Sequence, residues 1–155
     1  MIRLCKNMKA LIRYHSHIFR RAAVVLVVLA WSSFAFCGEI HDAAKNGDLD
    51  KVKALLKANP DLVFSKTDNG GTPLHWAVQN GHKDVVELLL ANKADVDAKD
   101  NNGVSPLHVA ADTGYTDVAQ LLLADNAAVN AKSNDGSTPL HEAAMMGHKD
   151  VVEPQ

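Results

Sequence analysis

The chain has 155 residues, of which 47% are hydrophobic and 22% are charged, a composition typical of one globular domain. Residues 1–37 hold six basic residues and no acidic one, which leaves 10 of the 16 basic residues against all 18 acidic residues in the remainder, a balance of −8. This excess of carboxylates argues against a nucleic acid partner, because binding a phosphate backbone needs lysine and arginine. Both cysteines, Cys5 and Cys37, fall in the first 37 residues, which excludes a disulfide framework or a cysteine zinc site elsewhere.

Residues 1–37 have the layout of an export signal. Six basic residues precede the apolar run 22–31, and small residues follow at Ser32, Ser33 and Ala35. This order of basic, apolar and small-residue regions is typical of a secretory signal. We therefore predict that residues 1–37 are a signal peptide or membrane anchor, and that the rest of the chain is exported, either periplasmic or secreted. A cytosolic location is disfavoured.

The fate of this segment has alternatives. Cleavage after Ala35 and cleavage after Cys37 both satisfy the small-residue preference, and the residues do not choose between them. A lipoprotein signal at Cys37 is disfavoured, because Phe36 stands where such signals need a small residue. The apolar run 22–36 has 15 residues, fewer than the ~20 that a spanning helix needs. Cleavage is therefore favoured over anchoring, and any membrane contact would be through this segment alone.

A repeat dominates the rest of the chain. The motif Thr72-Pro73-Leu74-His75 recurs with a 33-residue spacing, beginning again at Ser105 and at Thr138. A glycine follows each motif after five further residues and opens a second similar block, as in 81–90, 114–123 and 147–153. In period and motif the chain resembles the ankyrin-repeat family. Residues 40–56 follow the same outline without the signature, so the resemblance covers residues 39–153.

The resemblance implies the fold. It predicts an all-α ankyrin-repeat solenoid of stacked helix-turn-helix units with β-turn or hairpin loops, preceded by the apolar N-terminal signal helix. The expected units are a degenerate N-terminal capping repeat over 39–71, full repeats over 72–104 and 105–137, and a truncated repeat over 138–155.

The recurring residue types suit this arrangement. Thr72 can cap the first helix of its unit, and Pro73 suits the first helical position, where no N–H is needed. Gly81 ends that helix in the left-handed conformation. In the second helix Val85, Leu88 and Leu89 form one apolar stripe. The Asn-Gly and Asp-Gly pairs at 69–70, 102–103 and 135–136 favour tight turns with positive φ.

The last repeat is incomplete. Pro154 follows Val151 and Val152 closely, so we expect the second helix of this unit not to form. Three explanations are open: the chain is a fragment of a longer array, its end frays, or a partner covers it. We favour the first, because a solenoid normally ends in a polar capping repeat.

We find no basis for an enzyme, a cofactor or a metal site. The resemblance implies a structural role for His75, His108 and His141, whose rings would bond backbone groups of the next loop. Catalytic and nucleotide-binding motifs are missing from the sequence. Glu142 is interpreted as a surface residue. The acidic row Asp95, Asp97 and Asp100 lacks the glycine and glutamate of a calcium loop and is interpreted as solvated.

The function has to be argued from the surface of the repeats. The resemblance places partner binding on the concave side, formed by turn tips and first helices. The matching positions are Asp68, Asn69, Gly71, Trp76, Gln79, Asn80, Asn101, Asn102, Val104, Asp112, Thr113, Asn134, Asp135, Ser137, Met145 and Met146. For Trp76 we favour packing against the neighbouring helix over an exposed contact. For Met145 and Met146, a contact site and a seam with a further repeat are equally supported.

Two functional hypotheses follow. The first is a passive protein-protein interaction module outside the cytosol, which binds a partner of unknown identity and of basic or mixed charge on its concave face. The second is a regulatory part of a larger ankyrin-repeat protein, whose effector domain lies beyond the C-terminus.

Overall fold

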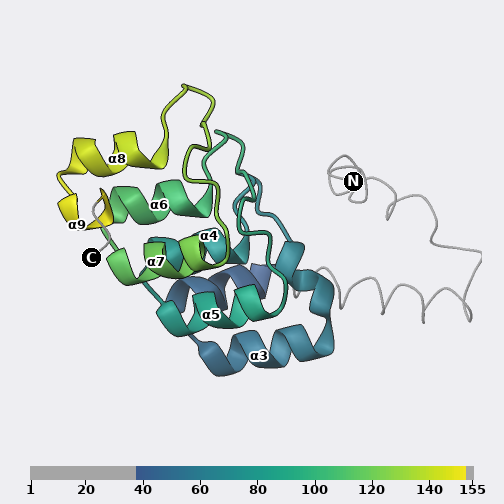
Figure 1. The fold of residues 1–155 in the computed structure, drawn as a ribbon. Helices are drawn as coiled ribbons and strands as arrows, with labels where there is room; N and C mark the ends of the chain where they lie inside the picture. The colour runs from purple at the N-terminus through teal and green to yellow at the C-terminus, as the bar shows by residue number, and fades with distance from the viewer. Residues whose placement is uncertain (1–37, 153–155) are drawn as a thin grey trace, which may run out of the picture. The chain divides into compact units, whose positions relative to one another are not determined.

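The computed structural model describes residues 38–152, in which helices pair along the chain and no strand occurs (Figure 1). The predicted signal or anchor segment, 1–37, and residues 153–155 lie outside the described part. Residues 38–46 form the first described helix. It is followed by α3 (Leu49–Ala58), the short 3-10 helix η1 (Pro60–Phe64), α4 (Pro73–Gln79), α5 (Lys83–Ala91), α6 (Pro106–Thr113), α7 (Thr116–Ala124), α8 (Pro139–Met146) and α9 (Lys149–Val152).

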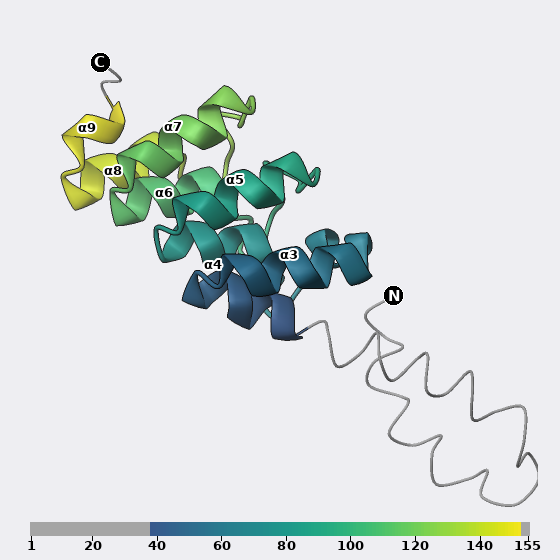
Figure 2. The ribbon, with the colours of Figure 1, turned by 90° about the horizontal axis from the view of Figure 1, so that it is seen from below.

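The helices stack in two layers. One layer contains α4, α6 and α8, each packed against the next, and the other contains α3, α5, α7 and α9 in the same succession. Figure 2 shows the second layer as successive steps from α3 to α9. Each helix also packs against its partner in the other layer, as α4 does against α5 and α6 against α7. The predicted solenoid of helix-turn-helix units is confirmed.

The first helix of each unit begins as expected. In α4, the Thr72 backbone N–H donates to His75 Nδ1 at 3.2 Å, and the Thr72 hydroxyl lies 2.8 Å from the same nitrogen. Ser105 with His108 repeats these contacts at the start of α6. A proline occupies the first helical position in α4, α6 and α8. The Thr-Pro-Leu-His motif is therefore a helix-starting device in which histidine takes the place of the usual Glu or Gln.

The second helices bury a broader surface than the single predicted stripe. In α5, Val85 and Leu89 are buried as expected, but Leu88 is only half-buried, whereas Val86 is fully buried. The helix α7 repeats this pattern, with Ala119 buried and Leu121 half-buried. The reason is that α5 packs against α4 of its own unit and also against α3 and α7. The three predicted residues all pack into the core, but the prediction missed Val86, because it assumed contact on one side only.

The connecting loops project as three tight turns, which we call fingers: residues 67–71, 100–104 and 133–137. The first finger is closed by Thr67 N–H donating to the Gly71 carbonyl and Gly70 N–H donating to the Thr67 carbonyl, both at 2.9 Å. The other two fingers are closed in the same way. Gly70 has φ +82°, a conformation that favours glycine and that the Asn-Gly pair predicted.

Glycine ends the first helix of each unit and allows the next unit to approach closely. At Gly114, φ is +76°, and a Cβ atom there would lie 2.5 Å from Nδ1 of the His148 ring. The Nε2 atom of the same ring donates to the Asp112 carbonyl at 3.0 Å. Tyr115 lies against Gly81 in the same manner. These glycines therefore serve both the turn and the contact between units.

The last described unit leaves its forward face open. Leu74 and Leu107 are fully covered by the unit that follows, at 0% and 3% exposure, but the equivalent Leu140 is 54% exposed. His141 is also exposed, unlike His75 and His108. The expectation that the second helix does not form was wrong, because Lys149–Val152 makes one turn of helix against α7 and α8.

Comparing substitutions at two glycines distinguishes the effect of backbone strain on stability from the effect of contact between units. Gly114 and Gly147 share φ +76°, but nothing lies within 4 Å of a Cβ atom at Gly147. We expect Gly147→Ala to lower the free energy of unfolding by about 1–2 kcal/mol through strain. Gly114→Ala should cost about 1–3 kcal/mol more, because the His148 ring must move. Urea unfolding followed by circular dichroism measures both.

The control is a double-mutant cycle. In a chain that already carries His148→Ala, the further change Gly114→Ala should cost no more than Gly147→Ala does, because the ring that a Cβ atom would meet is absent. Equal losses of stability for Gly114→Ala and Gly147→Ala would contradict the contact.

Candidate protein-binding surface

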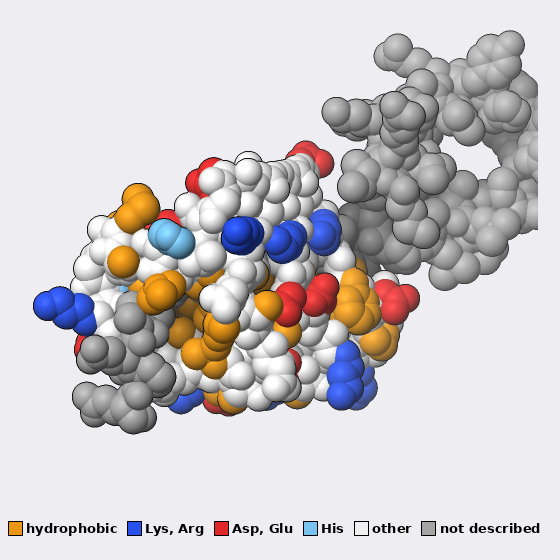
Figure 3. All heavy atoms as spheres, turned by 45° about the horizontal axis from the view of Figure 1, so that its top comes forward, with side chains coloured by type: hydrophobic (Ala, Val, Ile, Leu, Met, Phe, Trp, Pro, Cys, Tyr) orange, Lys and Arg blue, Asp and Glu red, His pale blue; other side chains and the backbone are white. Residues whose placement is uncertain are grey.

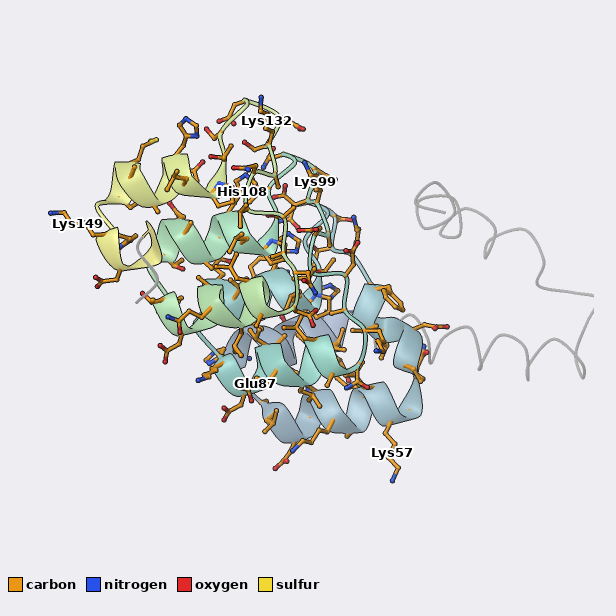
Figure 4. All side chains as sticks on the ribbon, viewed as in Figure 1. Lys57, Glu87, Lys99, His108, Lys132 and Lys149 are labelled. Carbon is orange, nitrogen blue, oxygen red and sulfur yellow. The ribbon has the colours of Figure 1, made fainter. Side chains whose placement is uncertain are left out.

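The signature histidines connect each helix start to the next finger. His75 Nε2 donates to the Val104 carbonyl at 3.1 Å, and His108 Nε2 lies 3.2 Å from the Ser137 carbonyl. Burial lowers the pKa of His75 below its usual value, although the bond to Val104 acts in the opposite direction. A neutral ring suits the site, because Nδ1 accepts the Thr72 N–H while Nε2 donates. The structural role that the resemblance implied is confirmed for these two rings, and Figure 4 shows His108 where α6 meets the loops.

The predicted binding positions lie on two kinds of element. The fingers carry Asp68, Asn69, Gly71, Asn101, Asn102, Val104, Asn134, Asp135 and Ser137. The first helices and their caps carry Trp76, Gln79, Asn80, Asp112, Thr113, Met145 and Met146.

Most polar groups on the fingers bond to the protein itself. The Asn101 side chain donates to the Asp68 carbonyl at 2.9 Å, and the Asn134 side chain donates to the Asn101 carbonyl at 3.0 Å. The backbone N–H groups of the same two asparagines donate to Asn69 and Asn102. These side chains hold neighbouring fingers in register. They are scaffold as much as contact surface.

Acidic side chains of the fingers and of the loops beside them also accept hydrogen bonds from within the protein. Asp135 accepts from the Ser133 hydroxyl and the Ser137 N–H, and these bonds lower the pKa of its carboxyl group. Asp100 accepts from Asn102 N–H and Val104 N–H in the preceding finger. The carboxylate of Asp97 accepts the Ala128 N–H of the next unit. The acidic row Asp95, Asp97 and Asp100, interpreted above as solvated, therefore also accepts backbone N–H groups and shapes the loops.

Three lysines run along the bases of the fingers at the 33-residue spacing. Lys66 Nζ donates to the Lys99 carbonyl at 2.9 Å, and Lys99 Nζ donates to the Lys132 carbonyl. Figure 4 shows Lys99 and Lys132 on successive loops, and Figure 3 shows lysine side chains in a row with hydrophobic and acidic side chains beside them. These lysines were not among the predicted positions, although they recur at the repeat spacing in the sequence.

Trp76 is half-buried on α4 and faces a cation. Its ring packs against the hydrophobic core, as favoured above, and Lys45 Nζ lies 5.6 Å from the ring centre. This is within the range of a cation–π contact. The indole N–H is buried without a hydrogen-bond partner. A packing role therefore predominates at this position, and Lys45 is a neighbour that sequence reasoning missed.

A groove of about 230 Å³ crosses the first-helix layer. It runs from α4 over α6 to α8 and includes one residue of the second finger. It is lined by Gln79, Val104, His108, Val109, Asp112, Thr113 and Glu142. Four of the predicted positions, Gln79, Val104, Asp112 and Thr113, thus converge on one depression.

Two further lining residues were missed. Val109 and Glu142 occupy the position of Trp76 in their own repeats, since each lies 33 residues beyond the previous one. Shifting Trp76 by the repeat period would have found both. Glu142 is half-buried beside the groove, so its interpretation as an ordinary surface residue was incomplete.

The C-terminal side of this layer is apolar and exposed. Met145 is 75% exposed and Met146 is 53% exposed, and both follow Glu142 on the same helix. Being three and four residues after Glu142, they lie on its face of α8. Methionine adapts its shape to a partner, so this patch suits a contact surface.

Residues 38–152 contain neither a metal-ligand cluster nor a membrane-spanning helix. No cluster of three or more histidine, cysteine or acidic side chains there could hold a metal ion. Within the same range, no helix has the length and apolar character needed to cross a membrane.

Known proteins resemble about a third of this chain. The relatives include acyl-CoA-binding domain-containing protein 4 of Oryza sativa subsp. japonica, 42% identical over 51 residues, which are 33% of this chain and 15% of that protein. The human 2-5A-dependent ribonuclease is 44% identical over 46 residues, 30% of this chain and 6% of that protein. The human NAD-capped RNA hydrolase NUDT12 is 34% identical over 50 residues, which are 32% of this chain and 11% of that protein. The chain thus spans only a small part of each relative.

The family model of ankyrin repeats in three copies matches residues 40–133 and 99–154. Together these matches cover most of the chain and all of its described helices except the first two residues of the helix over 38–46. The fold has the stacked helix pairs and projecting turns that the motif predicted. The chain belongs to the ankyrin-repeat family and forms a protein-protein interaction module.

Proposed function

We propose that the chain is a non-catalytic binding module that recognises a protein partner on the surface made by the fingers and the first helices. The observation that carries this proposal is the groove across α4, α6 and α8, together with the exposed Met145 and Met146 beside it. Methionine is among the residues enriched at protein interfaces.

The mechanism is that of a preformed surface. Hydrogen bonds between fingers and the buried histidines fix the loops before a partner arrives. A surface that is ordered in advance loses little conformational entropy on binding. The module therefore contributes affinity and orientation and performs no chemistry. Ankyrin-repeat domains in general bind and do not catalyse.

Cross-linking in cells tests this surface. A photo-reactive phenylalanine analogue at Gln79, beside the groove, should form covalent adducts with a protein partner, because this exposed position lies within the proposed contact. The matched control is the same analogue at Glu87, an exposed residue of α5 in the other layer (Figure 4). Mass spectrometry identifies the adducts. Equal labelling from both positions, or none from Gln79, would argue against a first-helix surface.

We also propose that the module works outside the cytosol, as a soluble domain after cleavage or as a domain held by residues 1–37. The basic and apolar order of that segment supports this.

Cell fractionation with intact-mass and N-terminal analysis tests the location. We expect a product that begins at Phe36 or Gly38 in the exported fraction, because small residues precede both positions at the required spacing. An uncut chain in the membrane fraction would support the anchored form. An uncut chain in the cytosol would refute export and leave the repeat assignment unchanged.

The open face of α8 favours a second candidate, a regulatory part of a larger ankyrin-repeat protein. Leu140, His141 and Ala144 are exposed here, whereas their equivalents one repeat earlier are buried. The loop glycine Gly136 has nothing near its Cβ position, unlike Gly103, which lies against Asn134. Another repeat placed in register would cover this face as the earlier interfaces are covered.

Two leucine substitutions test the second candidate. In the 155-residue chain Leu107→Ala should cost about 2–5 kcal/mol, because it leaves a buried cavity, and Leu140→Ala should cost less than about 1 kcal/mol. The same pair is then compared by thermal melting in the protein that native cells produce. If a repeat follows, both substitutions lower the melting temperature alike. A small effect of Leu140→Ala there would exclude the second candidate.

A further inference from the structure

The groove across α4, α6 and α8 combines an apolar wall with unpaired carboxylates. Val104 and Val109 are half-buried within it, and the carboxylate side chains of Asp112 and Glu142 border it. Neither carboxylate forms a hydrogen bond or an ion pair with any residue of the described part. The Asp112 backbone carbonyl is occupied by His148, but its side chain is not. Both acidic groups are therefore available to a ligand.

The size of the groove limits what it can hold. Its volume of about 230 Å³ is below the range of roughly 300–1,000 Å³ that encloses small molecules and cofactors. One long side chain of a partner protein fits this scale better than a separate ligand.

The charge of the groove selects the type of side chain. No lysine lines it, and residues 38–152 as a whole contain ten lysines, no arginine and seventeen carboxylates. An acidic side chain would be repelled, and an apolar one would take water from the carboxylates without replacing it. An arginine satisfies both surfaces, because its methylene stem can lie along Val104 and Val109 while its guanidinium donates to carboxylates. Its planar donors serve two acceptors better than a lysine ammonium does.

The surface next to the groove adds a second requirement. Met145 and Met146 lie one helical turn beyond Glu142 on α8 and are exposed. A segment whose arginine reaches Glu142 therefore brings its neighbouring residue over a methionine patch, where an apolar side chain is favoured.

We propose that the groove lined by Val104, Val109, Asp112 and Glu142 binds an arginine side chain of the partner protein, with an apolar neighbour of that arginine on Met145 and Met146. This assignment rests on the proposed binding function and names the chemistry of the partner.

Methyl NMR of the full chain tests the site with a defined probe. The probe is a blocked pentapeptide with arginine between two leucines, and its control contains citrulline, which has nearly the same shape without the charge. The arginine peptide should shift the methyl signals of Val104, Val109 and Met145 and bind more tightly than the citrulline peptide. Equal shifts and equal affinity for both peptides, or no shifts at these methyl groups, would overturn the assignment.

Charge-removing variants locate the contact. Asp112→Asn and Glu142→Gln should each weaken binding of the arginine peptide about two- to five-fold, the range for an exposed ion pair. Glu87→Gln makes the same chemical change on the opposite layer and should leave the affinity unchanged. If all three variants weaken binding equally, only net charge matters and the site is wrong. Unchanged amide spectra show that each variant folds.

Cross-linking separates this inference from the function on which it rests. If the Gln79 adduct persists with the same yield in Asp112→Asn and Glu142→Gln, the binding module stands and the arginine site fails. If no adduct forms from Gln79 in the unsubstituted chain, the proposed function itself fails.

Discussion

Contact between successive repeats is the constraint on which the whole structure depends. A helix pair alone leaves one side of its first helix uncovered, as Leu140 shows at the open end, while Leu107 in the same position is almost fully buried. Fully burying such a side chain contributes about 1.5–3 kcal/mol, and most of it comes only when the next unit is present. The units therefore stabilise one another and are expected to unfold cooperatively.

The same constraint explains the surface. His75 and His108 each start a first helix and also bond to the next finger, and the side chains of Asn101 and Asn134 bond to the finger before their own. The polar groups that build the stack are consequently not free for a partner. The carboxylates beside the groove and the methionines of α8 take no part in this hydrogen bonding and remain available. Residues that hold the stack together and residues that are available to a partner thus lie only a few positions apart in the sequence.

Where neighbouring units approach most closely at the helix ends, a single glycine makes the contact possible. The ring of His148 occupies the space that a side chain at Gly114 would take, and Tyr115 does so at Gly81. A glycine with positive φ at these positions ends a helix and leaves room for the neighbouring unit in one step. The end of a helix and the packing of the next unit therefore depend on the same residue.

The sequence by itself determined the repeat, its period, the helix starts at Thr72 and Ser105 and the glycine ends, because these depend on local backbone chemistry that recurs every 33 residues. It did not determine that Val86 is buried in preference to Leu88, because that depends on packing against three neighbouring helices. Only the tertiary structure decided which finger side chains are occupied, and that Glu142 borders a groove with Asp112. Such groupings join residues about 30 positions apart in the sequence. The repeat spacing tells which residues are equivalent, but it does not tell how their side chains are oriented.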